Sequence, residues 1–561
     1  MCGIVGYTGN ENAIPFLLNG IKRLEYRGYD SYGVFLQPEY IHKSTGNIDV
    51  ESFEKDVYGT TGIAHTRWAT SGEVNEINAH PHQYGKITIV HNGVISNYKD
   101  IKKKLESSGH HFKSETDSEV LAHLIGVNGV ANIPKAFSQI EGEVGSVLVT
   151  DDAFTGTIWA YSDGSPLVAG IDKNGGLYIA SDVKALAGYT KTCYRLNSMQ
   201  WVRLGGTDTM EQLIKGQEIE VPESTAEKDG FTHYMMKEIN EQSVQSDYDR
   251  QEFQLPWLRE ANIKIVACGS SYYAGLLGKC FLENIAHIPT TVEYASEVQK
   301  SPLITPETMH VAISQSGETK DTLSAAKRLT NAGEKLVSFH NSDYSTLTTV
   351  CRYNNNINAG PEIGVAATKT FFKTSLSLYQ LAEYYKSGKW SLCPQLKRDI
   401  AEVIACRSDI NEVAQQIGKY NNFLVLGSGY HYPIALEVAL KLKEVAYVHA
   451  EAMPAAEMKH GPIALVDSNT PSIFFYMDSD PNKEQILQNM DEIKSRKGNI
   501  LVFTNCQDVE ADWIIELPRG TKPELQPLVS VVAGQMLAYC VALIRGCDID
   551  KPRNLAKSVT V

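Results

Sequence analysis

The chain begins Met1-Cys2-Gly3-Ile4-Val5-Gly6-Tyr7, a stretch that places a cysteine directly behind the initiator methionine. A small residue at position 2 is the usual condition for removing that methionine, and removal would leave Cys2 with a free α-amino group. Because an α-amino group titrates near pKa ~8 and a thiol near ~8.5, the amine can accept the thiol proton at neutral pH. The stretch therefore predicts an N-terminal nucleophile that carries its own base. A cysteine at this position can also be accidental, so the prediction depends on what the following residues supply.

Length and composition limit the class of protein. The 561 residues predict three or four domains at ~100–200 residues each. The net charge of −14 argues against a nucleic-acid partner, since phosphate backbones are bound by clustered Lys and Arg. No apolar run approaches the ~20 residues that span a bilayer and no signal sequence starts the chain, so we expect no membrane partner and a cytoplasmic location. The ten cysteines show no CxxC pair and no zinc-like spacing with histidines, and we expect neither a metal nor a cofactor.

Short segments rich in β-branched residues dominate positions 4–217. Lys86–Val90 and Gly145–Val149 are examples of such predicted strands. Helices are predicted at Asn12–Glu25 and Asp117–Ile125, where polar residues precede apolar ones at helical spacing. Strands flanked by helices favour a sheet sandwich covered by helices.

Four residues of this region suit the hydrolysis of an amide in an α-amino acid. The Asn92 side-chain amide and the Gly93 backbone N–H, in an Asn-Gly turn after a strand, can donate to a developing oxyanion. Arg67 offers a planar fork for the substrate carboxylate, and Asp117 offers a carboxylate for its ammonium group. Taken singly, Asn-Gly is more often an ordinary turn, and Arg67 and Asp117 are more often ion-pair residues.

Six motifs occur in order here: Cys2-Gly3-Ile4, Tyr26-Arg27-Gly28-Tyr29-Asp30, His65-Thr66-Arg67-Trp68-Ala69-Thr70, Asn78-Ala79-His80-Pro81-His82, His91-Asn92-Gly93 and Thr116-Asp117-Ser118-Glu119. Together they resemble the N-terminal-nucleophile glutamine amidotransferases. The resemblance implies an α+β domain, an α/β/β/α sandwich of the Ntn-hydrolase type, over residues 2–215. It also implies the roles: Cys2 is the nucleophile, Asn92 and Gly93 form the oxyanion hole, Arg67, Thr70, His80 and Asp117 bind glutamine, and Trp68 gates the escape of ammonia. Tyr32 departs from the family, which usually has a small residue there.

The region after the first domain changes character. Residues 216–245 are predicted to be a linker, and its aromatic part, Phe231–Ile239, is typical of a segment that docks rather than floats. Beyond it, apolar strands alternate with helices, which predicts α/β domains with parallel sheets flanked by helices. The stretches Ile263–Tyr272 and Asn422–Tyr430 share one pattern of strand, Gly/Ser turn and helix. This repeat predicts two tandem domains of one ancestry, at residues 246–400 and 401–551, with a tail at 552–561.

A hydroxyl-rich turn in the first repeat suits a phosphate. His310–Ile313 is a predicted strand, Ser314–Thr319 a turn, and a helix is predicted from near Asp321. In parallel sheets ligands bind beyond the carboxyl ends of strands, where helix N-termini offer free N–H groups to anions. The turn is therefore a candidate phosphate cradle that needs no lysine. An ordinary Ser-rich loop is the alternative.

Charged residues gather between Ile434 and Pro462. Glu437, Lys441 and Glu444 lie on one face of a predicted helix, a pattern that is usually a solvated ion-pair stripe. Lys459 and His460 follow, directly before Gly461-Pro462. A lysine with a lowered pKa forms Schiff bases with ketones, and histidine moves protons at neutral pH.

The later motifs resemble paired sugar isomerase domains; they are Cys268–Tyr272, Ser314–Thr319, Glu362–Ala366, Ala439–Glu444, Lys459–Pro462 and Pro552–Val561. Joined to the first domain, they resemble the family of isomerising glutamine–fructose-6-phosphate aminotransferases. The resemblance implies that the sugar phosphate binds Ser271, Ser314, Gln315, Ser316, Thr319, Val365, Ala556 and Lys557. It further implies that Lys459 forms the Schiff base at C2, His460 opens the sugar ring, Glu444 moves a proton between C1 and C2, and Lys441 stabilises nearby negative charge. Ala367 stands where the family usually has serine.

The expected function is the conversion of L-glutamine and D-fructose 6-phosphate to L-glutamate and D-glucosamine 6-phosphate, which supplies UDP-N-acetylglucosamine synthesis. In the family the partner subunit provides His460, so we expect a homodimer with a shared sugar site. The tail, residues 552–561, is expected to cap the sugar and border the ammonia route. Three rivals stay open: the same architecture acting on another sugar phosphate, a non-catalytic sugar-phosphate sensor, and a glutaminase that feeds a separate partner.

Overall fold

The computed structural model describes residues 2–53, 56–221, 227–245, 253–255, 262–298, 308–389 and 394–559. Met1, Cys393 and the domain boundary expected at residue 246 lie outside these residues. The chain divides into two compact units, one of residues Met1–Thr225 with Ser558–Val561 and one of Ala226–Lys557.

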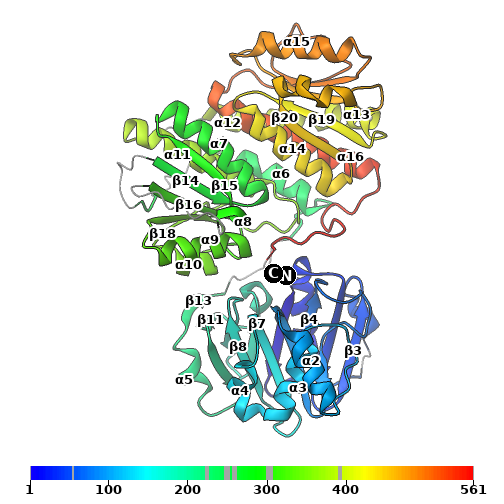
Figure 1. Ribbon diagram of the computed structural model, residues 1–561, viewed down its shortest axis with the longest axis vertical. Helices are drawn as coiled ribbons and strands as arrows, with labels where there is room; N and C mark the ends of the chain where they lie inside the picture. The colour runs from blue at the N-terminus through cyan, green and yellow to red at the C-terminus, as the bar shows by residue number, and fades with distance from the viewer. Residues whose placement is uncertain are drawn as a thin grey trace. The chain divides into compact units, whose positions relative to one another are not determined.

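Two antiparallel sheets form the middle of the first unit, drawn in blue to green-cyan in Figure 1. The eight-stranded sheet has the order β13 (Gln217–Glu220), β11 (Thr192–Arg195), β9 (Val168–Ile171), β10 (Leu177–Ala180), β1 (Gly3–Thr8), β4 (Thr61–Arg67), β2 (Ser31–Leu36) and β3 (Tyr40–Thr45). The five-stranded sheet has the order β12 (Gln200–Leu204), β8 (Ile158–Asp163), β7 (Gly142–Asp151), β6 (Ile87–Ile95) and β5 (His82–Tyr84).

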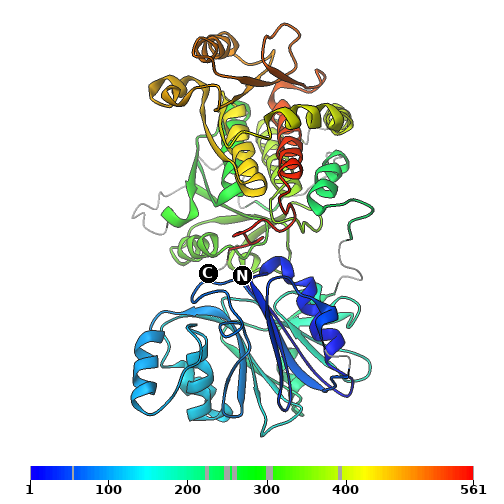
Figure 2. The ribbon, with the colours of Figure 1, turned by 90° about the vertical axis from the view of Figure 1, so that its right-hand side faces the viewer.

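Helices cover the outer faces of both sheets. They are α1 (Ile14–Arg23), α2 (Tyr98–Ser107), α3 (Glu119–Asn128) and α4 (Ile133–Phe137), whereas the short helix α5 (Thr209–Leu213) contacts β12. One apolar cluster, which includes Ile4, Ile63 and Leu148, fills the space between the sheets. A second cluster packs α1 on the larger sheet, and a third packs α2 to α4 on the smaller one; Figure 2 shows these helices on opposite sides. The predicted α/β/β/α sandwich is confirmed.

The helix α2 was not expected from the sequence. Ile101 and Leu105 are its buried residues, while lysines and other polar residues make up most of its remaining length. A single apolar pair four residues apart is too short a pattern to distinguish from a polar loop. The neighbouring predictions for α1 and α3 were close, because both bury several apolar residues at helical spacing.

Two five-stranded parallel sheets form the second unit. The first has the order β15 (Thr290–Tyr294), β14 (Asn262–Ala267), β16 (Thr308–Ser314), β17 (Leu336–His340) and β18 (Tyr353–Asn356). The second has the order β20 (His449–Pro454), β19 (Asn422–Gly427), β21 (Ser472–Tyr476), β22 (Ile500–Thr504) and β23 (Trp513–Glu516). Both sheets follow the order 2-1-3-4-5, as expected for tandem domains of one ancestry.

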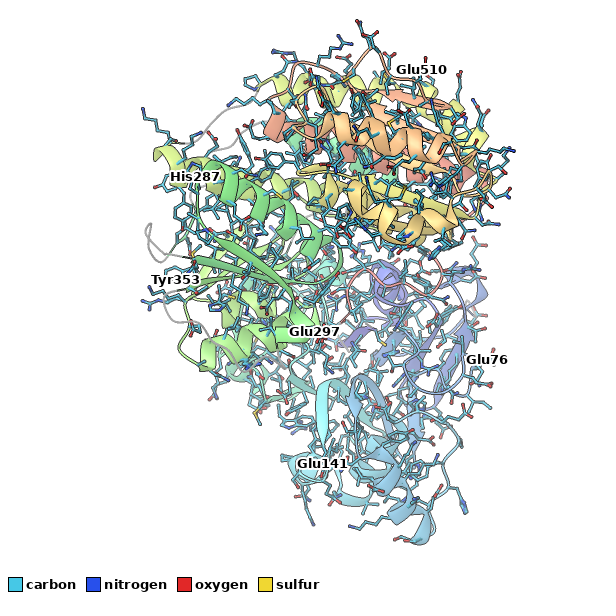
Figure 3. The ribbon with its side chains drawn as sticks, turned by 45° about the horizontal axis from the view of Figure 1, so that its top comes forward. Glu76, Glu141, His287, Glu297, Tyr353 and Glu510 are labelled. Atoms are coloured by element: carbon cyan, nitrogen blue, oxygen red, sulfur yellow. The ribbon has the colours of Figure 1, made fainter. Side chains whose placement is uncertain are left out.

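Helices flank the two sheets of this unit. They are α6 (Tyr234–Gln245), α7 (Gly269–Ile285), α8 (Ala295–Val298), α9 (Lys320–Asn331), α10 (Thr346–Val350), α11 (Lys369–Ser387), α12 (Pro394–Ala405), α13 (Arg407–Ile417), α14 (His431–Ala446), α15 (Lys483–Lys494) and α16 (Gln526–Ile544). Figure 1 shows α6, α7, α14 and α16 between the two sheets, and one apolar core runs through both halves. In Figure 3, Tyr353 and Glu297 mark the first half and Glu510 the second.

One sequence expectation about apolar runs was wrong. The segment Pro523–Ile544 is 22 residues long with a mean hydropathy of 1.9, so by length and composition it could cross a membrane. In the structure 89% of its most apolar window is buried, and α16 packs against α12, α13 and α14. A helix that is apolar all round is also what the centre of a large core requires, which explains the composition without a bilayer.

Candidate active sites

Cys2 lies at the start of β1, against the end of β4. Gly3 pairs with Thr66 in the ladder, and the Trp68 backbone N–H donates to Cys2 Sγ at 3.2 Å. A Cβ atom on Gly28 would lie 2.8 Å from the backbone of Arg67 and Trp68, so the glycine of the Tyr-Arg-Gly-Tyr-Asp motif allows this close approach. Burial raises the pKa of the Cys2 thiol, which is partly countered by that hydrogen bond and by nearby positive charge. The thiol therefore needs a base at neutral pH.

Asn92 and Gly93 lie inside β6 rather than in a turn, so the expected Asn-Gly turn is wrong. The β6–β7 pairing shifts register between Asn92 and Val94, a β-bulge at Gly93. Bulges re-aim side chains and interrupt the regular ladder next to active sites. Here the Asn92 side-chain Nδ2 donates to the Cys2 carbonyl oxygen at 2.8 Å, which brings the amide to the nucleophile.

Arg67 and Asp117 meet at one loop, residues 71–73. The Arg67 guanidinium donates to the carbonyl oxygens of Ser71, Gly72 and Glu73, the last at 3.2 Å. Asp117 accepts from the Ser71 hydroxyl at 3.2 Å and from the Ile95 N–H at 2.8 Å. A cation and an anion thus contact the same loop, an arrangement that can bind both charged ends of an amino acid.

The other expected residues of this site differ in exposure. Thr70 is exposed, and Trp68 is half-buried with its ring edge-on to Tyr29 at 5.9 Å between centroids. His80 is buried, and its ring stacks on His65 at 4.0 Å. Tyr32, the departure from the family, fills the core beneath α1, and its hydroxyl accepts from the Asp49 N–H at 3.3 Å.

The second candidate site lies at the carboxyl ends of β14 and β16. These neighbouring strands pair in parallel with Ala267 opposite Ile313, so the residues that follow each strand emerge at one edge. The strand order reverses at this point, which is where ligands bind in open parallel sheets. Ser271 lies in the first turn of α7, and the loop Ser314–Thr319 leads into α9.

The loop Ser314–Thr319 is tightly organised. The Ser314 hydroxyl lies 3.0 Å from that of Thr319 and accepts from the Gly317 N–H at 3.1 Å. Gly317 has a φ of 63°, a left-handed conformation that favours glycine. Buried Glu318 accepts from the Thr346 N–H and hydroxyl, both at 2.7 Å, and so ties the loop to α10. The hydroxyls are thereby held around the N-terminus of a twelve-residue helix.

Glu437, Lys441 and Glu444 are not a solvated stripe. Glu437 and Lys441 are fully buried, and Lys441 Nζ lies 3.3 Å from Glu437 and also pairs with Glu444. The Ser270 hydroxyl, from α7, donates to Glu437 at 3.0 Å and accepts from Lys441 at 3.2 Å. Burial raises the pKa of Glu437 to about 7, and the pKa of Lys441 is raised by its two carboxylates despite burial. Helix α14 therefore brings a buried acid–base group against Ser270, at the start of α7 in the other half.

Lys557 forms a second buried ion pair at this edge. Its side chain is 4% exposed and pairs with Glu362, which is fully buried. Burial alone would raise the pKa of Glu362, but the Lys557 ammonium lowers it to about 2. Burial and the neighbouring Glu362 raise the pKa of Glu238, in α6, to about 8.

Hydrogen bonds connect the loop Ser314–Thr319 to the segment just before Glu362. Gln315 O accepts from the Asn341 N–H at 3.0 Å, and Asn341 Nδ2 donates to Gly360 O at 2.7 Å, two residues before Glu362. Val365 is buried and its N–H donates to Asp550 O at 3.2 Å, while Ala556 is partly buried beside Lys557.

Lys459 and His460 lie elsewhere in the same unit. Both are exposed, in a short 3-10 segment, and Lys459 pairs with Glu492 of α15 at 3.6 Å. Figure 1 shows α15 at the top of the second half, whereas β16 and α9 belong to the first half. Within one chain, the structure thus brings Ser270, Lys441 and Glu444 together but does not add Lys459 or His460.

Comparisons with known proteins agree with this arrangement. Residues 65–188 match the glutamine amidotransferase domain family, and residues 258–384 and 416–545 match the SIS domain family. A glutamine–fructose-6-phosphate aminotransferase (isomerising) from Bacteroides thetaiotaomicron is 38% identical over 622 aligned residues, and one from Thermus thermophilus is 39% identical over 608; each alignment covers 100% of both chains.

One solved structure matches the C-terminal part of the chain. The C-terminal domain of glucosamine-fructose-6-phosphate aminotransferase from Francisella tularensis is 32% identical, with a TM-score of 0.52, and the match covers 58% of this chain and 100% of that one. With full-length relatives near 38% identity, the chain belongs to the family of isomerising glutamine–fructose-6-phosphate aminotransferases.

Proposed function

We propose that the chain transfers the amide nitrogen of L-glutamine to D-fructose 6-phosphate and releases D-glucosamine 6-phosphate and L-glutamate. The observation that carries this proposal is the buried Lys441, which is held between two glutamates and donates to Ser270 at the start of α7, after β14. A sensor needs no buried acid–base group, and a glutaminase that feeds a separate partner needs no hydroxyl-rich loop in its own chain. Moving the charged side chains of a lysine and a glutamate out of water costs free energy, so their presence at a buried position supports a chemical role.

In the first step Cys2 attacks the glutamine amide. The α-amino group of Cys2 accepts the thiol proton, and sulfur adds to the amide carbon, whose oxygen becomes the oxyanion. The Asn92 amide, 2.8 Å from the Cys2 carbonyl, and the Gly93 N–H stabilise that charge. Ammonia leaves, a thioester remains, and water hydrolyses it to glutamate. Arg67, Thr70, His80 and Asp117 are the proposed glutamine-binding residues, and Trp68 is the proposed gate.

In the second step the loop Ser314–Thr319 and Ser271 bind the phosphate, while Val365, Ala556 and Lys557 contact the sugar. A lysine of the chain forms an imine at C2 with loss of water, and ammonia displaces the lysine. Glu444 then removes a proton from C1 and returns it to C2, which converts the ketose imine into the 2-amino aldose. The Lys441 ammonium stabilises the negative charge that develops on the sugar oxygen.

Two lysines are candidates for the imine. The motif before Gly461-Pro462 predicts Lys459, whose side chain is 33% exposed and pairs with Glu492. A second candidate is Lys557, because it is buried and its partner Glu362 lies two residues after Gly360, which is hydrogen-bonded through Asn341 to Gln315 of the loop Ser314–Thr319.

Borohydride reduction in the presence of fructose 6-phosphate should trap the imine as a stable amine. We expect peptide mass spectrometry to find the adduct on Lys557, because its ion pair lies at the same sheet edge as the loop. A parallel sample without sugar controls for background modification. An adduct on Lys459 would instead support the motif-based prediction. If neither lysine carries an adduct that depends on the sugar, the imine step is refuted.

We propose a homodimer in which His460 opens the sugar ring in the site of a second copy. The exposure of Lys459 and His460 in the single chain supports this arrangement, since neither reaches the loop of its own chain. A cytoplasmic location fits the nine described cysteines, which are all free thiols.

The overall proposal is tested by one incubation with glutamine and fructose 6-phosphate, in which glutamate and amino-sugar phosphate are counted separately and each substrate is also omitted. We expect equal yields that need both substrates. Glutamate without amino sugar would contradict the assigned acceptor and favour another sugar phosphate, for which the hydroxyl missing at Ala367 is a candidate cause. Absence of glutamate in every sample would refute the first step.

A further inference from the structure

The oxyanion donor and the nucleophile stand on different sheets. Cys2 precedes β1 of the eight-stranded sheet, whereas Asn92 belongs to β6 of the five-stranded sheet. The position of the Asn92 amide relative to the Cys2 thiol therefore depends on the contacts that fix one sheet against the other at this point. Apolar packing alone fixes such a position loosely, because it is not directional.

His65 makes a directional contact between the sheets. It lies in β4 opposite Ile4 of β1, so both side chains share the face toward the other sheet, where Ile4 joins the core between the sheets. From there His65 Nε2 reaches Asn92 Oδ1 and the His91 carbonyl oxygen, each at 3.2 Å. The side chain is fully buried.

The hydrogen-bond chemistry allows one arrangement. Asn92 Nδ2 donates to the Cys2 carbonyl, so Asn92 Oδ1 faces His65 as an acceptor, and the His91 carbonyl is also an acceptor. His65 must therefore carry its proton on Nε2. Burial lowers the pKa of His65 to about 3, so the ring is neutral and holds this one proton at physiological pH. Without that N–H, the Asn92 amide oxygen would lose its donor, and only the contact of Nδ2 with the Cys2 carbonyl would orient the amide.

His80 restrains the ring of His65. The two rings stack with centroids 4.0 Å apart and an angle of 33° between their planes, and His82 packs edge-on against His80 at 4.5 Å. Burial keeps the pKa of His80 and His82 well below the usual value, so both rings are uncharged and do not repel each other. His80, expected at the glutamine pocket, thus contacts the oxyanion donor through His65.

We propose that His65 is a positioning residue of the glutamine site, which orients the Asn92 amide so that its N–H groups point toward Cys2. This inference rests on the proposed role of Cys2 as the nucleophile. It assigns His65 no contact with glutamine, so the effect of losing it falls on the transition state rather than on substrate binding.

The test compares His65→Leu, His65→Gln and wild type in glutamine hydrolysis. We expect His65→Leu to lower kcat roughly 10- to 100-fold, less than the roughly 100- to 1,000-fold cost of removing an oxyanion donor itself. The KM for glutamine and the inhibition constant of L-glutamate should stay within about threefold, because Arg67 and Asp117 are untouched. His65→Gln retains an N–H donor and should recover most of kcat.

The matched control is His123→Leu. His123 is equally buried in the same unit, but it contacts His110 and Glu119 rather than Asn92. We expect it to change thermal stability without changing kcat. Three results would overturn the inference: unchanged kcat in folded His65→Leu, a parallel loss of kcat and glutamate affinity, or an equal loss of kcat in His123→Leu. If His65→Leu does not fold, His65→Phe replaces it, because phenylalanine also lacks the N–H donor. Low kcat with intact glutamate affinity in folded His65→Phe supports the role, and full kcat refutes it. A wild-type enzyme without glutaminase activity would overturn the proposed function instead.

Discussion

Cys2→Ala is expected to abolish glutamine-dependent synthesis. Removing a nucleophile that acts as a unit with its base lowers kcat on the order of 10⁴- to 10⁶-fold. Without the thiol no tetrahedral oxyanion forms, so the remaining hydrogen-bond donors have no charge to stabilise. Glutamate release should fall to background in an assay that counts glutamate and amino-sugar phosphate separately. The affinity for fructose 6-phosphate should not change, since Cys2 belongs to the first unit and the phosphate loop to the second.

Cys193→Ala is the matched control for this experiment. Cys193 is a buried free thiol in β11 of the same unit, where it packs in the apolar core. We expect wild-type activity from it at slightly lower stability. Glutaminase activity that survives Cys2→Ala would refute the nucleophile. A preparation that retains Met1 should be as inactive as Cys2→Ala, because its α-amino group is not on the cysteine, and mass spectrometry of the N-terminus identifies that state.

The sequence motifs of the first site predicted which residues belong to it, but not the secondary structure in which those residues lie. Asn92 and Gly93 were expected in a turn, because Asn-Gly is the commonest hairpin signal. They form a bulge inside a nine-residue strand instead, with Asn92 paired to Ser146. A bulge arises from pairing with a distant strand, so local sequence carries no sign of it.

His65 was missed for a related reason. It precedes Arg67 by two residues in a quoted motif, but its partner Asn92 is 27 residues away and on the other sheet. Strand alternation places His65 and Arg67 on one face, and a buried histidine among apolar residues is most simply read as part of the core. The pairing of a histidine with a side-chain amide appears only when both sheets are in place.

For the charged face of α14, the sequence-based interpretation was wrong about exposure to solvent. Glu437, Lys441 and Glu444 have the spacing of a solvated ion-pair stripe, and the sequence alone favours that interpretation. In the structure this face is covered by α7, and Ser270 satisfies both Glu437 and Lys441. The contact is between the two halves of the unit, so it depends on how the repeats pack rather than on either repeat alone.

The parallel sheets were easier to predict than these contacts. Strand, Gly/Ser turn and helix repeat twice, and each strand is apolar because both of its faces are covered. The position of the phosphate loop follows from topology, since the carboxyl ends of β14 and β16 must share one edge. The place of Lys459 did not follow, because its position next to His460 in the sequence does not show which part of the fold it contacts.

Glu444→Gln should remove sugar conversion while it leaves glutamine hydrolysis intact. General acid–base catalysis contributes roughly 10²- to 10⁴-fold, and an amide of the same shape cannot carry the proton from C1 to C2. The change leaves Lys441 paired with Glu437, 3.3 Å away, so the buried ammonium keeps one counter-charge and the fold should persist. We expect amino-sugar formation to fall by that factor, with unchanged fructose 6-phosphate affinity.

Glu451→Gln provides the control, because it removes one carboxylate from an exposed position on β20 of the same half and should leave synthesis unchanged. Wild-type synthesis in Glu444→Gln would exclude Glu444 as the proton carrier and direct attention to Glu437, whose pKa burial raises to about 7. Loss of sugar affinity together with turnover would mean that Glu444 binds the substrate rather than moving its proton. Glu444 is less buried than Glu437 and Lys441, its partners in the cluster on α14, so it is the member of that cluster most accessible to a substrate.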